Sequence, residues 1–573
     1  MKMAWNSLRN AWSTHLALMK QERRAVATAA ICGGILLLFA GYLIFLPEFN
    51  LVPSYCSYNE QRLQSLLLFT MTCSLFMLCS TLREEWLRTF AVFSTTGKAL
   101  LAALLALGLL SAAGAAYPLF ALLEVSHFAL IFLTILCLAG IRVRLGNTFD
   151  LLVTFILVAV AWHYLLKFCL IYFAVAGQGT ELAMVRNALL QKFSHIRFFS
   201  QWQSWTLALM VLPLILEGRL SPLVRFFCLL PAMGWWLLFF MSGTRGTLLA
   251  CAVAFPITFF LYRRRSLPWL RWQAWAVSGG LSLYLLFYAL LPKIFGFAAA
   301  SGLSQGFAGR EFTTLTGRLK LWSIAVEMSG RHPWLGVGPM HYADDAVSYA
   351  AHPHNALLQI AAEWGLPALA IVLLLFIIGL RAWLRAAPGN PAEHEQEEGK
   401  LQPALFAALL TAAVHAMFSG IIVMPVSLTM MTLVLGWMLG ITRSRADKRN
   451  SRPPALPARG HHLLLILFAL AVLAGMTTPL STQLPTLEQV HREYAERTPP
   501  EGKSQPLFPP RFWILGYLAP YYPDQAVSLP AAAADDSPLK NGLVRHRAVP
   551  PNSAGPERAK KIVKLAEVPL ANR

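Results

Sequence analysis

The chain has 573 residues, of which 56% are hydrophobic and only 13% are charged, and its mean hydropathy is +0.53. Soluble domains carry about 25% charged residues, so this composition excludes an ordinary globular protein and indicates one that is integral to a membrane. The net charge of +20 could suggest nucleic acid, but Lys and Arg stand largely in short loops between apolar runs, where they set orientation. We therefore expect contact with membrane lipids and none with nucleic acid.

Apolar runs long enough to cross a bilayer, which takes ~20 mostly apolar residues, follow one another along most of the chain. Segment 1–24 is polar and basic, and the run after it lacks a small-residue cleavage site, so we expect a retained first span. The predicted spans are 25–46, 64–82, 99–120, 125–141, 151–175, 200–217, 222–242, 244–262, 272–292, 366–382, 402–424, 425–442 and 461–479. The sequence thus predicts an all-α polytopic membrane protein, with transmembrane helices 1–9 over 25–292 and helices 10–13 over 366–479, so about 12–13 in all.

Basic residues follow every second run, so alternating spans place them all on one side. That side is the cytoplasm by the excess of Lys and Arg in cytoplasmic loops. Segment 1–24 then lies in the cytoplasm, and the loop 293–365 and the Pro-rich tail 480–573 lie on the far side. The acidic, Pro- and Gly-containing segment 386–401 reads as a cytoplasmic linker.

The loop 293–365 is the longest polar stretch between two spans, and we expect helical segments within it. Three motifs in or before it place a basic side chain where a helical run begins: Ser242-Gly243-Thr244-Arg245-Gly246, Thr316-Gly317-Arg318 and His352-Pro353-His354-Asn355. A cation in a first helical turn opposes the helix dipole at ~0.3–1 kcal/mol, and helix N-termini bind anions. The pattern predicts that Arg245, Arg318 and His354 converge on an anion.

Each arginine also has a plain structural interpretation. Arg245 could extend to lipid headgroups, although it lies on the side where basic residues are scarce, and its flanking glycines admit close approach. Arg318 could be a solvated loop residue; Thr316 before it is a good N-cap, and Trp322 lies one turn on, on the same helical face.

His352 and His354 raise the alternative of a metal site. Two histidines two residues apart can share a metal on a strand but diverge on a helix, and Pro353 restricts the geometry further. Acidic residues that could complete such a site are Glu311, Asp344, Asp345 and Glu363. Because no established metal-ligand spacing is present, we expect no metal and no cofactor.

The far-side loop before the sixth predicted span is a further candidate. Arg197 precedes Phe198-Phe199-Ser200-Gln201-Trp202-Gln203, a mixture of aromatic and amide side chains that could line a sugar site. Aromatic residues at this depth are also ordinary membrane anchors.

In order and spacing these motifs resemble the O-antigen ligase superfamily, which also contains O-antigen polymerases and bacterial protein O-oligosaccharyltransferases. The resemblance covers roughly 242–382. It rests on the three motifs above with Trp322, on His332-Pro333-Trp334-Leu335-Gly336-Val337-Gly338, and on Glu363-Trp364-Gly365.

The resemblance implies a multi-pass enzyme of the bacterial inner membrane. Its site, on the periplasmic loop 293–365, would move a glycan from undecaprenyl diphosphate to an acceptor hydroxyl, without a metal. The family's essential histidine maps onto His354, and its two pyrophosphate-contacting arginines map onto Arg245 and Arg318. Arg197, Trp322 and Asn355 are further candidate substrate-binding residues.

Four functions remain open at this point. The leading one is ligation of a lipid-linked O-antigen to lipid A-core; a repeat-unit polymerase and a protein O-oligosaccharyltransferase would use the same donor with another hydroxyl acceptor. From a different class, the chain could be a polysaccharide exporter, although transporters tend to show inverted repeats and none is found. His354 would either accept the acceptor's proton or only orient the diphosphate.

Overall fold

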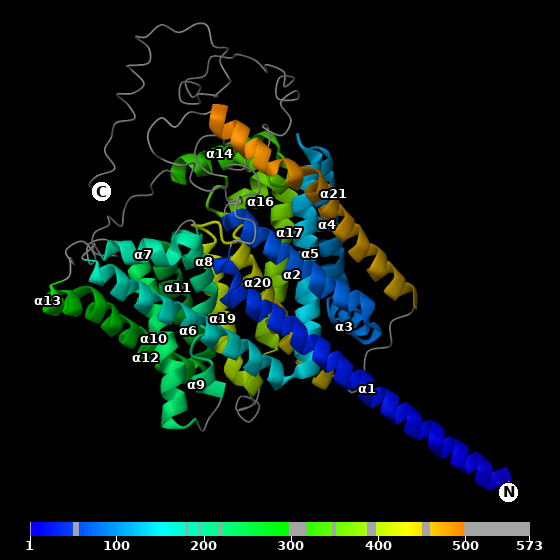
Figure 1. Ribbon diagram of the computed structural model, residues 1–573. Helices are drawn as coiled ribbons and strands as arrows, with labels where there is room; N and C mark the ends of the chain where they lie inside the picture. Colours follow the sequence, from blue (N-terminus) through cyan, green and yellow to red (C-terminus); the bar gives the residue numbers. More distant parts are fainter. Residues whose placement is uncertain are drawn as a thin grey trace.

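The computed structural model describes residues 2–49, 57–178, 182–193, 196–216, 220–296, 318–345, 351–386, 397–449 and 459–497. These parts of the chain are helical and contain no strand, which confirms the predicted all-α class (Figure 1). The predicted N-cap Thr316, the linker residues 387–396 and the tail beyond Arg497 lie outside the described residues.

The helices that form the body of the molecule are mostly 18 residues or longer. In chain order they are α1 (Lys2–Ile44), α2 (Ser57–Leu78), α3 (Ser80–Ala91), α4 (Thr95–Ala113), α5 (Pro118–Leu145), α6 (Asn147–Gly177), α10 (Pro222–Ser242), α11 (Arg245–Tyr262), α12 (Leu267–Leu285), α17 (Leu366–Arg385), α19 (Glu397–His415), α20 (Pro425–Arg449) and α21 (Arg459–Arg497). The shorter elements are η1 (Leu46–Glu48), α7 (Ala183–Leu190), η2 (Gln191–Phe193), α8 (Ile196–Thr206), α9 (Pro213–Leu216), η3 (Arg263–Ser266), η4 (Leu286–Leu290), α13 (Leu291–Phe295), α14 (Arg318–Arg331), α15 (Tyr342–Asp345) and α16 (Ala356–Trp364).

Within the described ranges, nine helical segments are long and apolar enough to cross a membrane, or ten if the bent pair α2–α3 forms one span. This is fewer than the predicted 12–13, for three reasons. The helices α11 and α12 are joined in one helical segment, Arg245–Phe295, where two separate spans were predicted. The helix α19 begins with charged residues, and the run 200–217 is interrupted by turns between α8 and α9.

The segment Arg245–Phe295 has 51 residues and would be ~76 Å long as one straight helix, more than twice the ~30 Å of a bilayer core. The chain turns at η3, where Arg263 has a φ of +48°. Two contacts show that α11 runs antiparallel to α19. Gly246 in the first turn of α11 lies against His415 at the end of α19, and Tyr262 at the end of α11 contacts Phe406 near the middle of α19.

Three predicted boundaries differ from the structure. The break before α5 lies at 114–117 rather than 121–124, where Gly114 ends α4 and Pro118 begins α5. The predicted basic loop after α2 contains the helix α3, which makes an angle of 106° with α2. The helix α21 continues past the predicted start of the tail at 480 as far as Arg497.

Basic residues gather at one end of the helical body, which we call the basic face. Its described members include Arg83, Arg88, Arg142, Arg144, Arg225, Arg263, Arg264, Arg265, Arg385, Arg443, Arg445 and Lys448. The opposite end, which we call the site face, carries α14 and α16 above the ends of α4 and α17 (Figure 1). The basic residues of the short loops thus lie at one end of the body, in the alternation that the sequence predicted.

Buried ion pairs join the helices near the basic face. Arg142 on α5 contacts Asp150 on α6 at 2.9 Å and Glu398 on α19 at 3.0 Å, and Trp437 on α20 donates to Asp150 at 2.6 Å. Removing one partner of a buried pair typically costs about 3–5 kcal/mol, because the other charge stays uncompensated. These contacts fix four helices relative to one another.

Large apolar side chains point outward around the body. Leu170 on α6 is 74% exposed and Phe260 on α11 is 71% exposed. Side chains of this kind at the perimeter of a helical bundle match a surrounding of lipid tails. Together with the long apolar helices they mark a multi-pass membrane protein.

Candidate functional site

Two of the three predicted helix starts lie where the sequence placed them. The helix α11 begins at Arg245, and α14 begins at Arg318. Gly243, the residue after α10, lies in the left-handed region with a φ of +59°, and only Gly243 and Thr244 separate the two helices. Each arginine is therefore in a first helical turn, next to backbone N–H groups that lack helical partners.

Arg245 and Arg318 are brought together although 73 residues separate them. Arg318 is partly buried, and burial lowers the pKa of its guanidinium below the ordinary value; the positive charge of Arg245 lowers that pKa further. Two guanidiniums whose charges act on each other thus lie at two helix N-termini. Such a place favours an anion.

His354 does not stand in a first helical turn, and this prediction was wrong. The helix α16 starts at Ala356, and the N-cap is Asn355, whose side-chain oxygen accepts from the Leu358 N–H at 3.0 Å. Asn is among the strongest N-cap residues, so it rather than Pro353 determines where the helix begins. His354 precedes the cap with a φ of +54°, a conformation that costs a residue other than Gly about 1–3 kcal/mol.

His352 holds this unusual turn. Its Nδ1 accepts from the backbone N–H of His354 at 3.1 Å, and the two imidazole rings lie 4.2 Å apart between centroids. His352 is only 1% exposed and packs on Gly420, where an added Cβ would lie 2.3 Å from its Cε1 atom. Backbone strain maintained by a buried neighbour is found most often at functional sites.

Trp322 connects the arginine pair to the histidine turn. Its indole Nε1 donates to the carbonyl oxygen of Pro353 at 3.0 Å. Arg318 lies one helical turn before Trp322, and His354 directly follows Pro353. The three main predicted residues are thus held on adjoining elements of the site face.

The other predicted substrate-binding residues have mixed outcomes. Asn355 uses its side-chain oxygen as a helix cap, and Trp322 uses its N–H to hold the histidine turn. Arg197 is exposed in the first turn of α8, one turn before Ser200. The carbonyl oxygen of Ser200 accepts from Thr247 of α11 at 3.3 Å, so α8 does reach the helix that carries Arg245.

Sequence reasoning missed one histidine at this site. His415 ends α19 and is 4% exposed; its Nδ1 lies 2.7 Å from Ser204 Oγ of α8. Its other edge faces Gly246, next to Arg245. A single histidine at the end of an apolar run carries no motif, so only its contacts identify it.

The remaining motif residues form a scaffold. Val337 N–H donates to Ala362 O at 2.9 Å, and Leu366 N–H donates to Pro333 O at 2.8 Å. Gly365 has a φ of +87°, and a Cβ there would lie 2.4 Å from the carbonyl oxygen of Trp334. Two chain segments thus lie backbone to backbone at the end of α16. Their role is to support α16 and the turn before it.

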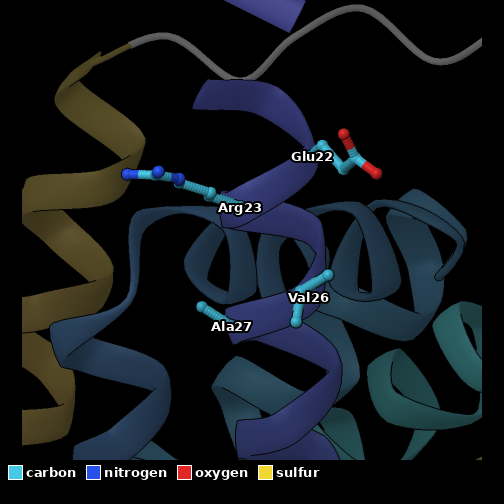
Figure 2. A pocket seen from close by; sticks show the side chains of 4 residues that line it. All are labelled: Glu22, Arg23, Val26 and Ala27. Atoms are coloured by element: carbon cyan, nitrogen blue, oxygen red, sulfur yellow. The ribbon is translucent and has the colours of Figure 1, made fainter. Parts of the chain in front are cut away.

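Away from the site face, the described parts of the chain contain weaker candidates for a functional site. No group of three or more His, Cys, Asp or Glu side chains that could hold a metal ion is found in the ranges above. A hollow of about 390 Å³ lies at the start of the apolar part of α1, lined by Glu22, Arg23, Val26 and Ala27. Figure 2 shows Glu22 and Arg23 pointing to different sides of α1 there, and the hollow has none of the features gathered on the site face.

Comparison with known proteins adds independent evidence. A family model described as O-antigen ligase matches residues 228–373. The chain carries an O-antigen ligase domain over these residues. The search of curated proteins finds no match.

The O-antigen ligase domain contains Arg245, Arg318 and His354, together with the scaffold around α16. Ser204 and His415 lie outside the matched residues. The match confirms the predicted family, and it supports an activity of the O-antigen ligase or polymerase type in general.

Proposed function

We propose that the protein transfers a glycan from undecaprenyl diphosphate to an acceptor hydroxyl, at the periplasmic face of a bacterial inner membrane. The observation that carries this proposal is the convergence of Arg245 and Arg318, each in a first helical turn, next to the strained turn of His354. The O-antigen ligase domain around them makes a lipid-linked glycan the best-fitting anionic substrate.

In the proposed reaction the acceptor oxygen attacks the anomeric carbon of the donor glycan. A new glycosidic C–O bond forms while the bond from that carbon to the diphosphate oxygen breaks. The diphosphate leaves with the electron pair as undecaprenyl diphosphate, and the acceptor's proton passes to the imidazole of His354. The proposed reaction uses neither a metal nor a cofactor.

Arg245 and Arg318 would stabilise the negative charge that develops on the leaving diphosphate. A guanidinium is planar and can contact two oxygens at once, which suits a phosphate better than a point charge does. Preorganised charges aimed at a developing anion are usually the largest contribution to catalysis. Binding of the diphosphate would relieve the repulsion between the two guanidiniums.

His354 would act as the general base. Imidazole has an ordinary pKa near 6.5, and a positioned base typically contributes ~10²–10⁴ in rate. The left-handed backbone of His354, held by His352, aims the ring in a direction that a residue in the first turn of α16 would not have. If His354 only orients the diphosphate, replacing it should lower the rate by much less than ~10²–10⁴.

Ligation to lipid A-core is the first candidate for the acceptor. A deletion strain tests it against the alternatives, by gel analysis of lipopolysaccharide and of glycoproteins. We expect lipopolysaccharide without any O-antigen cap. Caps of a single repeat unit would instead indicate a polymerase, and unchanged lipopolysaccharide with lost glycoprotein would indicate a protein O-oligosaccharyltransferase.

A further inference from the structure

A buried histidine from outside the O-antigen ligase domain lies against the proposed diphosphate site. An ideal Cβ added at Gly246 would lie 2.8 Å from His415 Nε2 and 2.9 Å from its Cδ2. This edge of the imidazole therefore faces the first turn of α11, where Arg245 stands. Arg318 is close enough for its positive charge to act on the same ring.

The opposite edge of the ring is held by α8. Ser204 Oγ lies 2.7 Å from His415 Nδ1 and 3.1 Å from the carbonyl oxygen of Ser200. When the single hydrogen of the hydroxyl is donated to His415, Nδ1 is the acceptor and the hydrogen of a neutral imidazole is on Nε2. Burial and the neighbouring guanidinium of Arg318 both disfavour a second proton on this ring.

We propose that His415 is a third binding group for the donor diphosphate, whose neutral Nε2–H donates to a phosphate oxygen placed by Arg245 and Arg318. The inference rests on the proposed function, because it takes the diphosphate as the ligand. A neutral donor adds direction and a hydrogen bond without adding a third positive charge to a pair that already repels. Ser204 would be a positioning residue that selects the tautomer.

The first test is steady-state transfer by the purified full-length protein, with the lipid-linked donor and the acceptor varied separately. A hydrogen bond to a charged group contributes roughly 10- to 100-fold. His415→Ala should therefore lower kcat/KM for the donor by about that factor and leave the KM for the acceptor unchanged. His415→Gln should recover much of the loss, because its amide N–H can donate from a similar position.

A glycine substitution tests the same contact without removing a polar group. Gly246→Ala would place a methyl group against the Nε2 edge of His415, so we expect a donor-specific defect like that of His415→Ala. Gly379→Ala is the matched control, since nothing lies within 4 Å of the Cβ that it adds to α17. Equal melting temperatures of the purified variants would show that folding is not the cause.

Binding of undecaprenyl diphosphate to the same proteins separates this inference from the proposed function. We expect His415→Ala to bind it about 10- to 100-fold more weakly than the unmodified protein. Wild-type transfer with unchanged donor affinity in His415→Ala would overturn the role of His415 and leave the proposed function standing. If binding depends on His415 but no hydroxyl acceptor receives the glycan, the role of His415 would stand and the proposed function would be overturned. If the unmodified protein does not bind undecaprenyl diphosphate, both the role of His415 and the proposed function would be contradicted.

Discussion

At the scale of single residues, the site depends on side chains that are unfavourable where they stand. Arg245 and Arg318 bring positive charge to two helix N-termini, and the charge of Arg245 lowers the pKa of Arg318. His354 adopts a backbone conformation that favours glycine. Unfavourable features of this kind persist where the surrounding structure enforces them, and a ligand can relieve them.

The two histidines of the turn should respond differently to substitution. His354→Ala should lower transfer by ~10²–10⁴ if the ring is the general base, with little change in melting temperature. The ring of His352 is buried and accepts from the His354 N–H. We therefore expect His352→Ala to lower both stability, by about 1–3 kcal/mol, and activity.

Transfer assays and thermal unfolding of the purified variants check this pair. His332→Ala is the control, because His332 is an exposed histidine of the same loop. Full activity of His354→Ala at normal expression would remove His354 from the mechanism.

At the scale of elements, the turn between α19 and α20 supports the histidine turn. Gly420 lies in it, and a Cβ there would be 2.3 Å from His352 Cε1. Gly420→Ala should therefore displace His352, and His354 with it, and reduce transfer by at least about tenfold. A Gly420→Ala protein with normal kinetics would show that the position of His352 does not matter for the reaction.

The sequence predicted elements well where local composition determines them. Hydrophobic runs and the basic residues between them predicted the helices and their alternation, because lipid contact imposes both patterns. The starts of α11 and α14 followed from Gly and Thr before an arginine. The start of α16 did not, because Pro353 and Asn355 compete for the first turn and the stronger cap prevails.

Features that depend on contacts distant in sequence were not predicted. The contact between His415 and Ser204 joins residues 211 apart. The angle between α2 and α3 and the interruption between α8 and α9 also depend on neighbouring helices. Nothing in a local pattern encodes them, so the sequence indicated the two arginines and the histidine of the proposed site but not the contact between α8 and α19.

At the scale of the whole molecule, the separation of the basic face from the site face predicts orientation. We expect the site face to lie in the periplasm, because short cytoplasmic loops are the basic ones. A cysteine at exposed Ser323 on α14 should react with a membrane-impermeant maleimide in cells with an intact inner membrane. A cysteine at exposed Thr96, near the basic face, should react only after that membrane is opened; the reverse pattern would move the site away from the proposed compartment.

Metal independence is a second property of the whole protein that can be tested. The sequence has no metal-ligand spacing, so we expect transfer by the purified protein to be unchanged in excess EDTA. Loss of activity that a divalent ion restores would revive His352 and His354 as candidate ligands.

The central claim is that Arg245 and Arg318 share one diphosphate. The direct measurement is a double-mutant cycle on kcat/KM for the lipid-linked donor, with Arg245→Ala, Arg318→Ala and the double variant, and with Arg318→Lys beside them. Residues that bind one group are coupled, typically by about 0.5–3 kcal/mol, and lysine cannot reproduce the two-pronged contact of arginine. We predict clear coupling and a loss in Arg318→Lys of at least about tenfold; strictly additive losses, or an Arg318→Lys protein with normal kinetics, would contradict the account.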